Sequence, residues 1–453
     1  MLLVPPQKTG KSDLIRTLEL TPLANPTISA QDLRALEGQA AQAEMSGRLD
    51  DAAQLWERIV STVPTHAPAL FSLGQYSLRK NDPTRARHWL DQVVKADGRD
   101  PQQWLSLAVA CQGLKDEAGE EAALQGALKA DPSDLLALIL RANLFERQGK
   151  VADAARLYGA VAVVAPPPDR LHPDLRASVA HAIAFRSEHQ RRYGEFLDAQ
   201  LARHLDGLPA EHTRRFREAV DLLAGRRRRF ESFPSSFFFP RLETIEFFDR
   251  PLFPWLDAFE ANTEVIRDEF VAVLQEDRGF SPYIGYPDGV PLNQWAELNH
   301  NPSWSAFRLI EKGLRVEENA SRCPRTMALL ATAPQPDQPG RTPAAMFSLL
   351  KPHTRIPPHT GETNVRLIAH VPLIVPEKCG FRVGNSTREW VPGQAFVFDD
   401  SIEHEAWNES DKPRAVLIFD IWNPLLSDEE RRLVSALSAA MNAFAGAPQE
   451  SSL

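Results

Sequence analysis

A repeat of 34 residues in the first third of the chain constrains its fold more than any other feature. Turn-forming residues recur at this spacing: Pro64, Gly98, Pro132 and Pro166. Small residues recur in the same phase, where two helices must approach closely: Ala40, Gly74, Ala108 and Ala142. A pair of amphipathic helices of this size cannot bury its apolar face alone, so neighbouring pairs must stack. The period therefore predicts a short helical superhelix.

Two further columns of the repeat support this prediction. One marks the points where helices should end: Gly47, Asn81, Lys115 and Gly149. The other supplies bulky apolar side chains: Trp56, Leu90, Leu124 and Tyr158. The pattern resembles the tetratricopeptide repeat over about residues 33–166. Such an array presents a concave surface, for which two roles stay open: docking of a peptide or partner protein, and service as a spacer or dimerisation element.

Length, charge and cysteine content narrow the class of protein. A chain of 453 residues exceeds a single compact core, so two or three domains are expected. The net charge of -9 gives no general affinity for nucleic acid or anionic membrane. Three widely spaced cysteines argue against a disulfide framework. Because no apolar stretch is long enough for a signal peptide or a membrane span, we expect a cytoplasmic protein.

The region after the repeats combines helix with an aromatic, proline-punctuated stretch. Helical spacing resumes over residues 175–225 without the 34-residue phase, and a run of four arginines at 226–229 precedes the sequence FESFPSSFFFP. The arginines could bind RNA or phosphate, but in an acidic protein such a run is more typical of a solvated helix end. We therefore expect a helical linker at residues 167–240 and assign this stretch no catalytic role.

After about Pro336 the pattern changes to short apolar runs separated by turn residues, which is typical of strands. The candidates are MFSLLK, NVRLIAHVPLIV, GFRV, EWV, QAFVFD and RAVLIFDIW. Closely spaced strands of this kind predict a sandwich or a double-stranded β-helix, which is a jelly roll. The expected fold class is thus an α + β multidomain protein, with a helical superhelix followed by a jelly roll and its flanking helices.

Two histidine motifs lie within these strands. His359 begins HTGETNVRLIAH, His404 lies in FDDSIEHEAW, and Arg414 follows ten residues later, before the closing DIWNP. The order resembles the aspartyl/asparaginyl β-hydroxylases over about residues 249–433. The resemblance implies a cupin-like jelly roll that uses Fe(II) and 2-oxoglutarate, with O₂ as co-substrate, and it implies that His359 and His404 are the iron ligands.

The resemblance also assigns the remaining site residues. Most oxygenases of this kind use two histidines and a carboxylate two residues after the first, but Gly361 occupies that position here. In the resembled family this residue is normally glycine, and water can fill the vacant place. Asp400 could hold such a water and is expected to be catalytic. The 2-oxoglutarate would be bound by three further side chains: Arg414 and Ser348 at the distal carboxylate, and His370 at the other end.

The expected function is hydroxylation of an unactivated C–H bond in a peptide or protein side chain, or in a carrier-bound substrate, docked by the repeats. In relatives that act on aspartate or asparagine, basic side chains bind the target carboxylate at positions that align with Met346 and Ile368. Both residues are apolar here, which favours a different peptide side chain, a small molecule or an acyl or lipid chain. A non-catalytic repeat scaffold with a degenerate barrel is the remaining alternative.

The expected boundaries follow from these patterns. They are an N-terminal extension at 1–32, repeats at 33–166, a helical linker at 167–240, a dioxygenase domain at 241–435 and a tail at 436–453.

Overall fold

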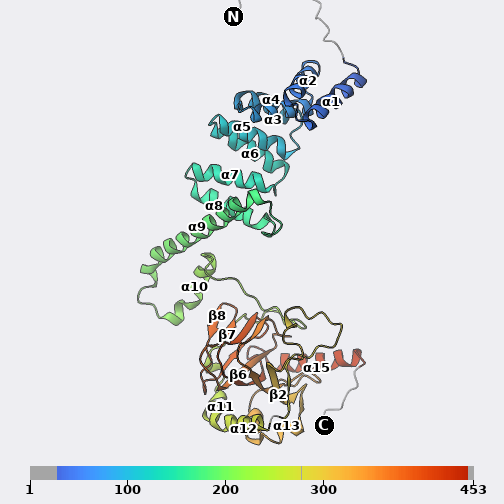
Figure 1. Cartoon of the computed structure of the whole chain (residues 1–453). Helices are drawn as coiled ribbons and strands as arrows, with labels where there is room; N and C mark the ends of the chain where they lie inside the picture. Colours follow the sequence, from blue (N-terminus) through green and yellow to red (C-terminus); the bar gives the residue numbers. More distant parts are fainter. Residues whose placement is uncertain (1–27, 277, 447–453) are drawn as a thin grey trace, which may run out of the picture. The chain divides into compact units, whose positions relative to one another are not determined.

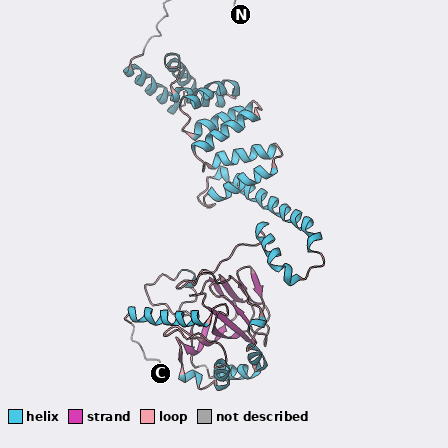
Figure 2. Ribbon diagram, turned by 180° about the vertical axis from the view of Figure 1, so that it is seen from behind, coloured by secondary structure: helices cyan, strands magenta, loops and turns pink. Residues whose placement is uncertain are grey.

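The computed structural model describes residues 28–276 and 278–446, which form two compact units. The first unit ends at Gly207 and the second begins at Leu208. Figure 2 shows that the first unit is built from helices and that the strands belong to the second. Most of the expected N-terminal extension and the end of the expected tail lie outside the described residues.

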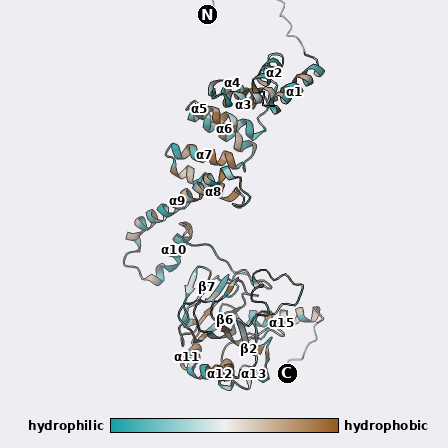
Figure 3. Cartoon of the chain, in the orientation of Figure 1, coloured by the Kyte–Doolittle hydropathy of each residue, from teal (hydrophilic) through white to brown (hydrophobic). Residues whose placement is uncertain are grey.

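Helices α1 to α8 of the first unit form four consecutive pairs, each packed on the next (Figure 1). Their bounds are α1 Ala30–Met45, α2 Leu49–Thr62, α3 Ala67–Arg79, α4 Pro83–Ala96, α5 Pro101–Gly113, α6 Glu117–Ala130, α7 Leu135–Arg147 and α8 Val151–Val164. The long helix α9, Pro173–Leu205, packs on α8. Hydrophilic and hydrophobic residues mix along these helices (Figure 3), as expected when only one face of each is buried. The predicted repeat array is confirmed.

The repeat columns have clear physical causes. At the helix ends, Asn81 and Lys115 adopt positive φ angles of 55° and 58°, like the glycines that fill the same column elsewhere. This left-handed conformation ends a helix and turns the chain into the next. At the crossing of α3 and α4, a Cβ added to Gly74 would lie 2.6 Å from the side chain of Leu90. The small-residue column therefore sets how closely the paired helices approach.

The second unit contains two antiparallel sheets with flanking helices. The seven-stranded sheet has the order β1-β2-β4-β11-β6-β9, with β3 paired to β2, and the four-stranded sheet has the order β5-β10-β7-β8. The strands are β1 Phe280–Pro282, β2 Trp304–Glu311, β3 Leu314–Arg315, β4 Ala345–Leu350, β5 Thr354–His359, β6 Arg366–Ile374, β7 Cys379–Val383, β8 Ser386–Arg388, β9 Phe396–Phe398, β10 His404–Asn408 and β11 Arg414–Trp422. The helices are α10 Ala210–Leu223, α11 Leu256–Ala261, α12 Thr263–Gln275, α13 Glu317–Ala320, α14 Pro324–Leu330 and α15 Asp428–Phe444, with short 3₁₀ turns at Arg250–Leu252 and Asn293–Trp295.

Strand β11 separates two hydrophobic cores. Its residues Leu417 and Phe419 pack on the helix-covered side of the large sheet, in a core that includes residues of α11, α12 and α14. Its residues Val416 and Ile418 face the small sheet, together with residues of β7 and β10. This alternation follows from the period of two residues along a strand. It puts Arg414 on the face between the sheets.

The strand prediction was right for most of the apolar runs and wrong for EWV. The segment 389–391 is not a strand, and the short β8 precedes it. Strands β1, β2, β3, β5, β8 and β10 were not predicted, and β2 begins well before Pro336. Strand β5 contains Pro357 and Pro358, which favour turns in a sequence, and both are tolerated because β5 is an edge strand.

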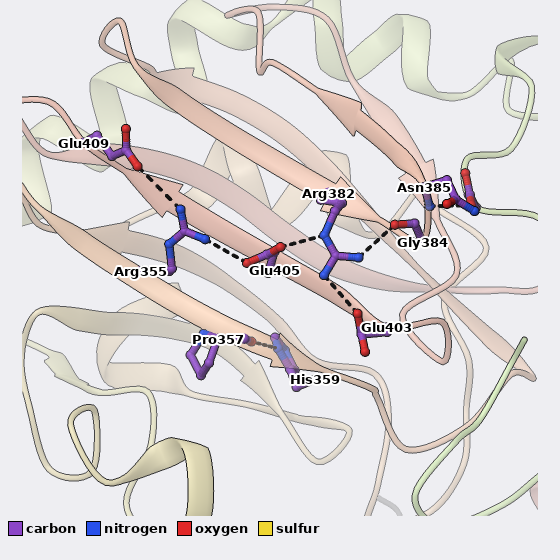
Figure 4. A network of polar contacts seen from close by, with 10 residues as sticks. Arg355, Pro357, His359, Arg382, Gly384, Asn385, Glu403, Glu405 and Glu409 are labelled. Carbon is purple, nitrogen blue, oxygen red and sulfur yellow. Dashed lines mark hydrogen bonds and ion pairs between the residues drawn. The ribbon is translucent and has the colours of Figure 1, made fainter. Parts of the chain in front are cut away.

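A ladder of charges fixes the order of the small sheet (Figure 4). Glu405 of β10 accepts hydrogen bonds from Arg355 of β5 at 3.0 Å and from Arg382 of β7 at 2.6 Å. Arg382 also reaches Glu403 at 3.0 Å. Opposite charges on neighbouring strands stabilise one register over its alternatives. These ion pairs therefore stabilise the position of β10 between β5 and β7. His404 and Ala406 lie on the face of β10 opposite to Glu405.

The run of four arginines at 226–229 follows the end of α10. Arg227 forms an ion pair with Glu218, and Arg229 forms one with Glu231.

Within the described part of the chain, no helix is both long enough and apolar enough to cross a bilayer.

Candidate active site

A cavity of about 640 Å³ lies between the two sheets of the second unit. All six residues that the sequence assigned to the site line it: Ser348, His359, His370, Asp400, His404 and Arg414. They come from strands β4, β5, β6, β10 and β11 and from the loop before β10. The fold thus brings together residues that are up to 66 positions apart.

His359 and His404 lie opposite each other on β5 and β10, with ring centroids 4.1 Å apart. The register between these strands is irregular at this point, because His404 pairs with His359 whereas Ala406 pairs with Ile356. Strand β5 therefore carries one extra residue, a bulge of the kind that redirects a side chain. The bulge turns the His359 ring toward His404.

The hydrogen bonds of these histidines determine which ring nitrogen is free. Nδ1 of His359 lies 2.8 Å from the carbonyl of Pro357, and Nδ1 of His404 lies 3.0 Å from that of Ile402. A carbonyl only accepts, so each Nδ1 carries the proton and each Nε2 presents a lone pair. Burial lowers the pKa of both histidines, to about 3 for His359 and about 4 for His404; His404 lowers the pKa of His359 further, and the charges of Arg382 and Arg366 lower that of His404. Both are therefore neutral at pH 7, as metal binding requires.

Asp400 occupies the place where a side chain at position 361 would be. A Cβ added to Gly361 would lie 2.1 Å from Oδ2 of Asp400, and the Gly361 amide donates to the carbonyl of Asp400 at 2.6 Å. Arg366 holds the same carboxylate at 3.5 Å. Oδ1 of Asp400 is buried and has no hydrogen-bond partner among the described residues. The carboxylate is thus supplied from a different loop, and one of its oxygens is left without a hydrogen-bond partner among the described residues.

We expect Gly361→Ala to destabilise the second unit by about 1–3 kcal/mol, the usual cost of overpacking, because the new methyl meets the Asp400 carboxylate. Urea unfolding measures the loss. In the double variant Gly361→Ala/Asp400→Ala the clash is gone, so the two effects should not add. Strict additivity in this double-mutant cycle would show that the contact is not the cause.

Two imidazoles with adjacent free Nε2 atoms fit a divalent metal ion. Among the described residues, no group of three His, Cys, Asp or Glu side chains is placed to hold a metal. A metal bound by His359 and His404 would therefore keep several coordination positions for other ligands. The unpartnered oxygen of Asp400 is suited to hold one of those ligands by a hydrogen bond.

Arg414 lies in the same cavity as a buried cation without a counter-ion. Its side chain is 2% exposed, its Nε has no hydrogen-bond partner, and no carboxylate of the described residues pairs with it. Its contacts are Ser348 Oγ at 3.3 Å and the ring of Trp390 at 4.7 Å. Burial lowers its pKa to about 10, so it stays charged at pH 7. An unpaired buried guanidinium needs an anionic ligand.

Ser348 and His370 add hydrogen-bond donors to this cationic end. Ser348 Oγ accepts from Arg414 and, at 3.2 Å, from Trp304, so its own hydrogen remains available to a ligand. His370 Nδ1 accepts from Trp390 at 3.1 Å, which places the ring proton on Nε2. Burial, followed by the charge of Arg414, lowers the pKa of His370 well below its usual value. His370 is therefore neutral and can donate from Nε2. His359 and His404, by contrast, carry their proton on Nδ1.

Sequence reasoning missed three residues of the site. Trp390 contacts both Arg414 and His370, although its segment was taken for a strand. Trp304 stacks on Tyr283 with ring centroids 3.8 Å apart and donates to Ser348. Arg366 is buried and joins Asp400 to Asp420, which it contacts at 2.6 Å. Each gains its role from a long-range contact, so no local motif marks it.

Comparison with known proteins agrees with this geometry. The family described as Aspartyl/Asparaginyl beta-hydroxylase matches residues 260–424, and the tetratricopeptide repeat matches residues 39–103 and 112–170. Aspartyl/asparaginyl beta-hydroxylase of Homo sapiens is 34% identical over 181 residues, which are 40% of this chain and 22% of that protein. Ornithine lipid ester-linked acyl 2-hydroxylase of Rhizobium tropici is 36% identical over 183 residues, 40% of this chain and 61% of that protein.

A third relative is aspartate beta-hydroxylase domain-containing protein 2 of Homo sapiens, 33% identical over 211 residues, which are 46% of this chain and 55% of that protein. The chain thus spans less than two thirds of each of these three relatives. The matched region contains all six site residues. The chain therefore carries a domain of the aspartyl/asparaginyl β-hydroxylase family, a family of 2-oxoglutarate dependent dioxygenases, behind an array of tetratricopeptide repeats.

Proposed function

We propose that the second unit is an Fe(II) and 2-oxoglutarate dependent hydroxylase. The observation that carries this proposal is the presence, in one cavity, of two neutral imidazoles with ring centroids 4.1 Å apart and of a buried arginine that has no carboxylate partner among the described residues. The imidazoles suit a divalent metal, and the arginine suits a dicarboxylate that also reaches this metal. A degenerate barrel would have no reason to keep the uncompensated charge, which costs stability.

When bound, iron and 2-oxoglutarate supply the oxidation: O₂ converts the keto acid to succinate and CO₂, and one oxygen atom enters a substrate C–H bond. His359 and His404 would hold the iron, while Arg414 and Ser348 would bind the distal carboxylate. His370 would donate from Nε2 to the other end of the keto acid. Asp400 would orient a water through its oxygen that has no partner among the described residues.

For the substrate, we propose a peptide or protein side chain that the repeat array helps to dock. The human relative named after aspartyl and asparaginyl hydroxylation supports a protein substrate, and the repeats supply a surface suited to one. We further propose that the protein acts in the cytoplasm and that nucleic acid is not among its partners.

A second candidate is an acyl chain. Met346 and Ile368 both line the cavity, and Arg366, one of several cations in its lining, is already paired with Asp400 and Asp420. Met346 and Ile368 therefore offer hydrocarbon to the incoming group at the two positions where relatives place basic side chains. The acyl hydroxylase among the relatives supports the same view.

Anaerobic titration of the full chain with Fe(II) and then 2-oxoglutarate tests the proposal. We expect one iron per chain and a visible charge-transfer band once the keto acid chelates the metal. Absence of both in folded protein would favour the scaffold alternative. Mass spectrometry of cells with and without the active protein would then identify the substrate, because a protein target and an acyl lipid each gain 16 mass units but are recovered in different fractions.

A further inference from the structure

The segment at residues 232–239, which we call the strap, crosses both loops that carry metal-site residues. It belongs to the aromatic, proline-punctuated stretch FESFPSSFFFP, to which the sequence analysis gave no function. It also lies before residue 260, where the match to the β-hydroxylase family begins. Any role it has is therefore outside the matched domain.

The first half of the strap binds the loop that precedes His404. The amide of Phe233 donates to the carbonyl of Ser401 at 2.8 Å, and the hydroxyls of Ser232 and Ser401 lie 2.6 Å apart. Ser401 is fully buried and gives its own hydrogen to Asp399 at 2.5 Å. Ser232 is therefore the donor to Ser401. A chain of hydrogen bonds thus runs from the strap through Ser401 to Asp399.

The second half binds the loop that follows His359. The amide and the hydroxyl of Ser235 both donate to the carbonyl of Gly361, at 2.9 and 3.2 Å. The amides of Ser236 and Phe237 each donate to the carbonyl of Glu362 at 3.0 Å. Three consecutive residues thus hold the backbone at the position where most related oxygenases carry their third ligand.

Only Pro234 separates the two halves. Proline fixes one backbone torsion and restricts the residue before it to extended conformations, so the spacing between the two anchors varies little. The loops themselves meet directly through the Gly361 amide and the Asp400 carbonyl. The strap therefore adds a second, stiff connection between the loop of His359 and the loop of His404.

We propose that the strap is a positioning element for the metal site, with Ser232 and Ser235 as its positioning residues. It holds the two loops at a fixed separation, so that His359, Asp400 and His404 face one another before a metal arrives. Such preorganisation raises affinity because less order has to be gained on binding. The inference rests on the proposed function for the presence of a metal.

The test is a titration of the full chain with Co(II), in which the visible absorption of the bound ion reports the binding. We expect the double variant Ser232→Ala/Ser235→Ala to bind Co(II) roughly 10- to 100-fold more weakly, the range typical for lost outer-shell partners. Ser435→Ala is the matched control: Ser435 lies on α15 of the same unit, and the substitution removes its 2.6 Å hydrogen bond to Asp337. It should bind as the parent chain does.

A rescue variant separates positioning from general loss of structure. Ser235→Thr keeps the hydroxyl on an exposed residue and should restore most of the affinity that Ser235→Ala loses. Equal affinity of the parent and the Ser232→Ala/Ser235→Ala variant would overturn the strap inference while leaving the proposed function intact. A parent chain that takes up no Co(II) and no Fe(II) would instead refute both.

Discussion

His404→Ala is expected to abolish metal binding and, with it, the formation of succinate from 2-oxoglutarate. His404 is one of two facing imidazoles, and its Nε2 is kept free for a ligand by the hydrogen bond from Nδ1 to Ile402. Removing it leaves His359 as the one remaining imidazole ligand. The loss of affinity should exceed the roughly 100-fold that is seen when an outer-shell partner is removed. Calorimetric titration with Fe(II) under anaerobic conditions, together with a succinate assay, measures both effects.

His353→Ala provides the matched control. His353 is an exposed histidine in the same unit, and it binds Asp411 at 2.9 Å without lining the cavity. It should retain full affinity and turnover. Near-ultraviolet circular dichroism should show that both variants keep their tertiary packing. Unchanged succinate formation by folded His404→Ala protein would rule out His404 as an iron ligand.

Arg414→Leu is expected to have opposite effects on binding and on stability. Loss of a buried, hydrogen-bonded charge pair costs about 2–5 kcal/mol, so the affinity for 2-oxoglutarate should fall roughly 30-fold to several thousand-fold. In the ligand-free chain the same change removes a buried cation that has no carboxylate partner among the described residues. Replacing such a charge with an apolar group of similar length is neutral or stabilising. The free energy of unfolding should therefore stay constant or rise.

The two effects are measured by 2-oxoglutarate titration of the iron-loaded chain and by urea unfolding of the ligand-free chain. Arg355→Leu is the control, because Arg355 is an exposed arginine of the same unit whose partners are Glu405 and Glu409. It should leave binding unchanged. If Arg414→Leu instead destabilised the ligand-free chain by several kcal/mol and still bound 2-oxoglutarate normally, Arg414 would be a structural residue.

Much of this architecture could be predicted because its signals are local. The repeat columns reflect contacts between helices that are neighbours in sequence, and the β11 alternation follows from the geometry of one strand. The motifs around His359, His404 and Arg414 are short, so the resemblance proposed six candidate site residues, and all six line one cavity.

The remainder depends on contacts between distant segments, which one sequence does not reveal. Strands β5 and β10 are recognisable only as a pair, since prolines weaken the signal of the first and polar residues that of the second. Trp390 gains its role from Arg414 and His370, which lie on other strands. The strap spans more than 120 positions to reach Gly361. Its serines resemble ordinary loop residues until both anchors are seen.

The crowding between Gly361 and Asp400 also bears on how this active site can evolve. A return to the usual ligand set needs a carboxylate at 361 and a smaller residue at 400. If the first change came alone, the new side chain would collide with Asp400; if the second came alone, Arg366 would lose one of its two carboxylates. Either single change is therefore expected to destabilise the second unit. Residues 361 and 400 form one unit of the site, which tolerates a new ligand set only when both positions change together.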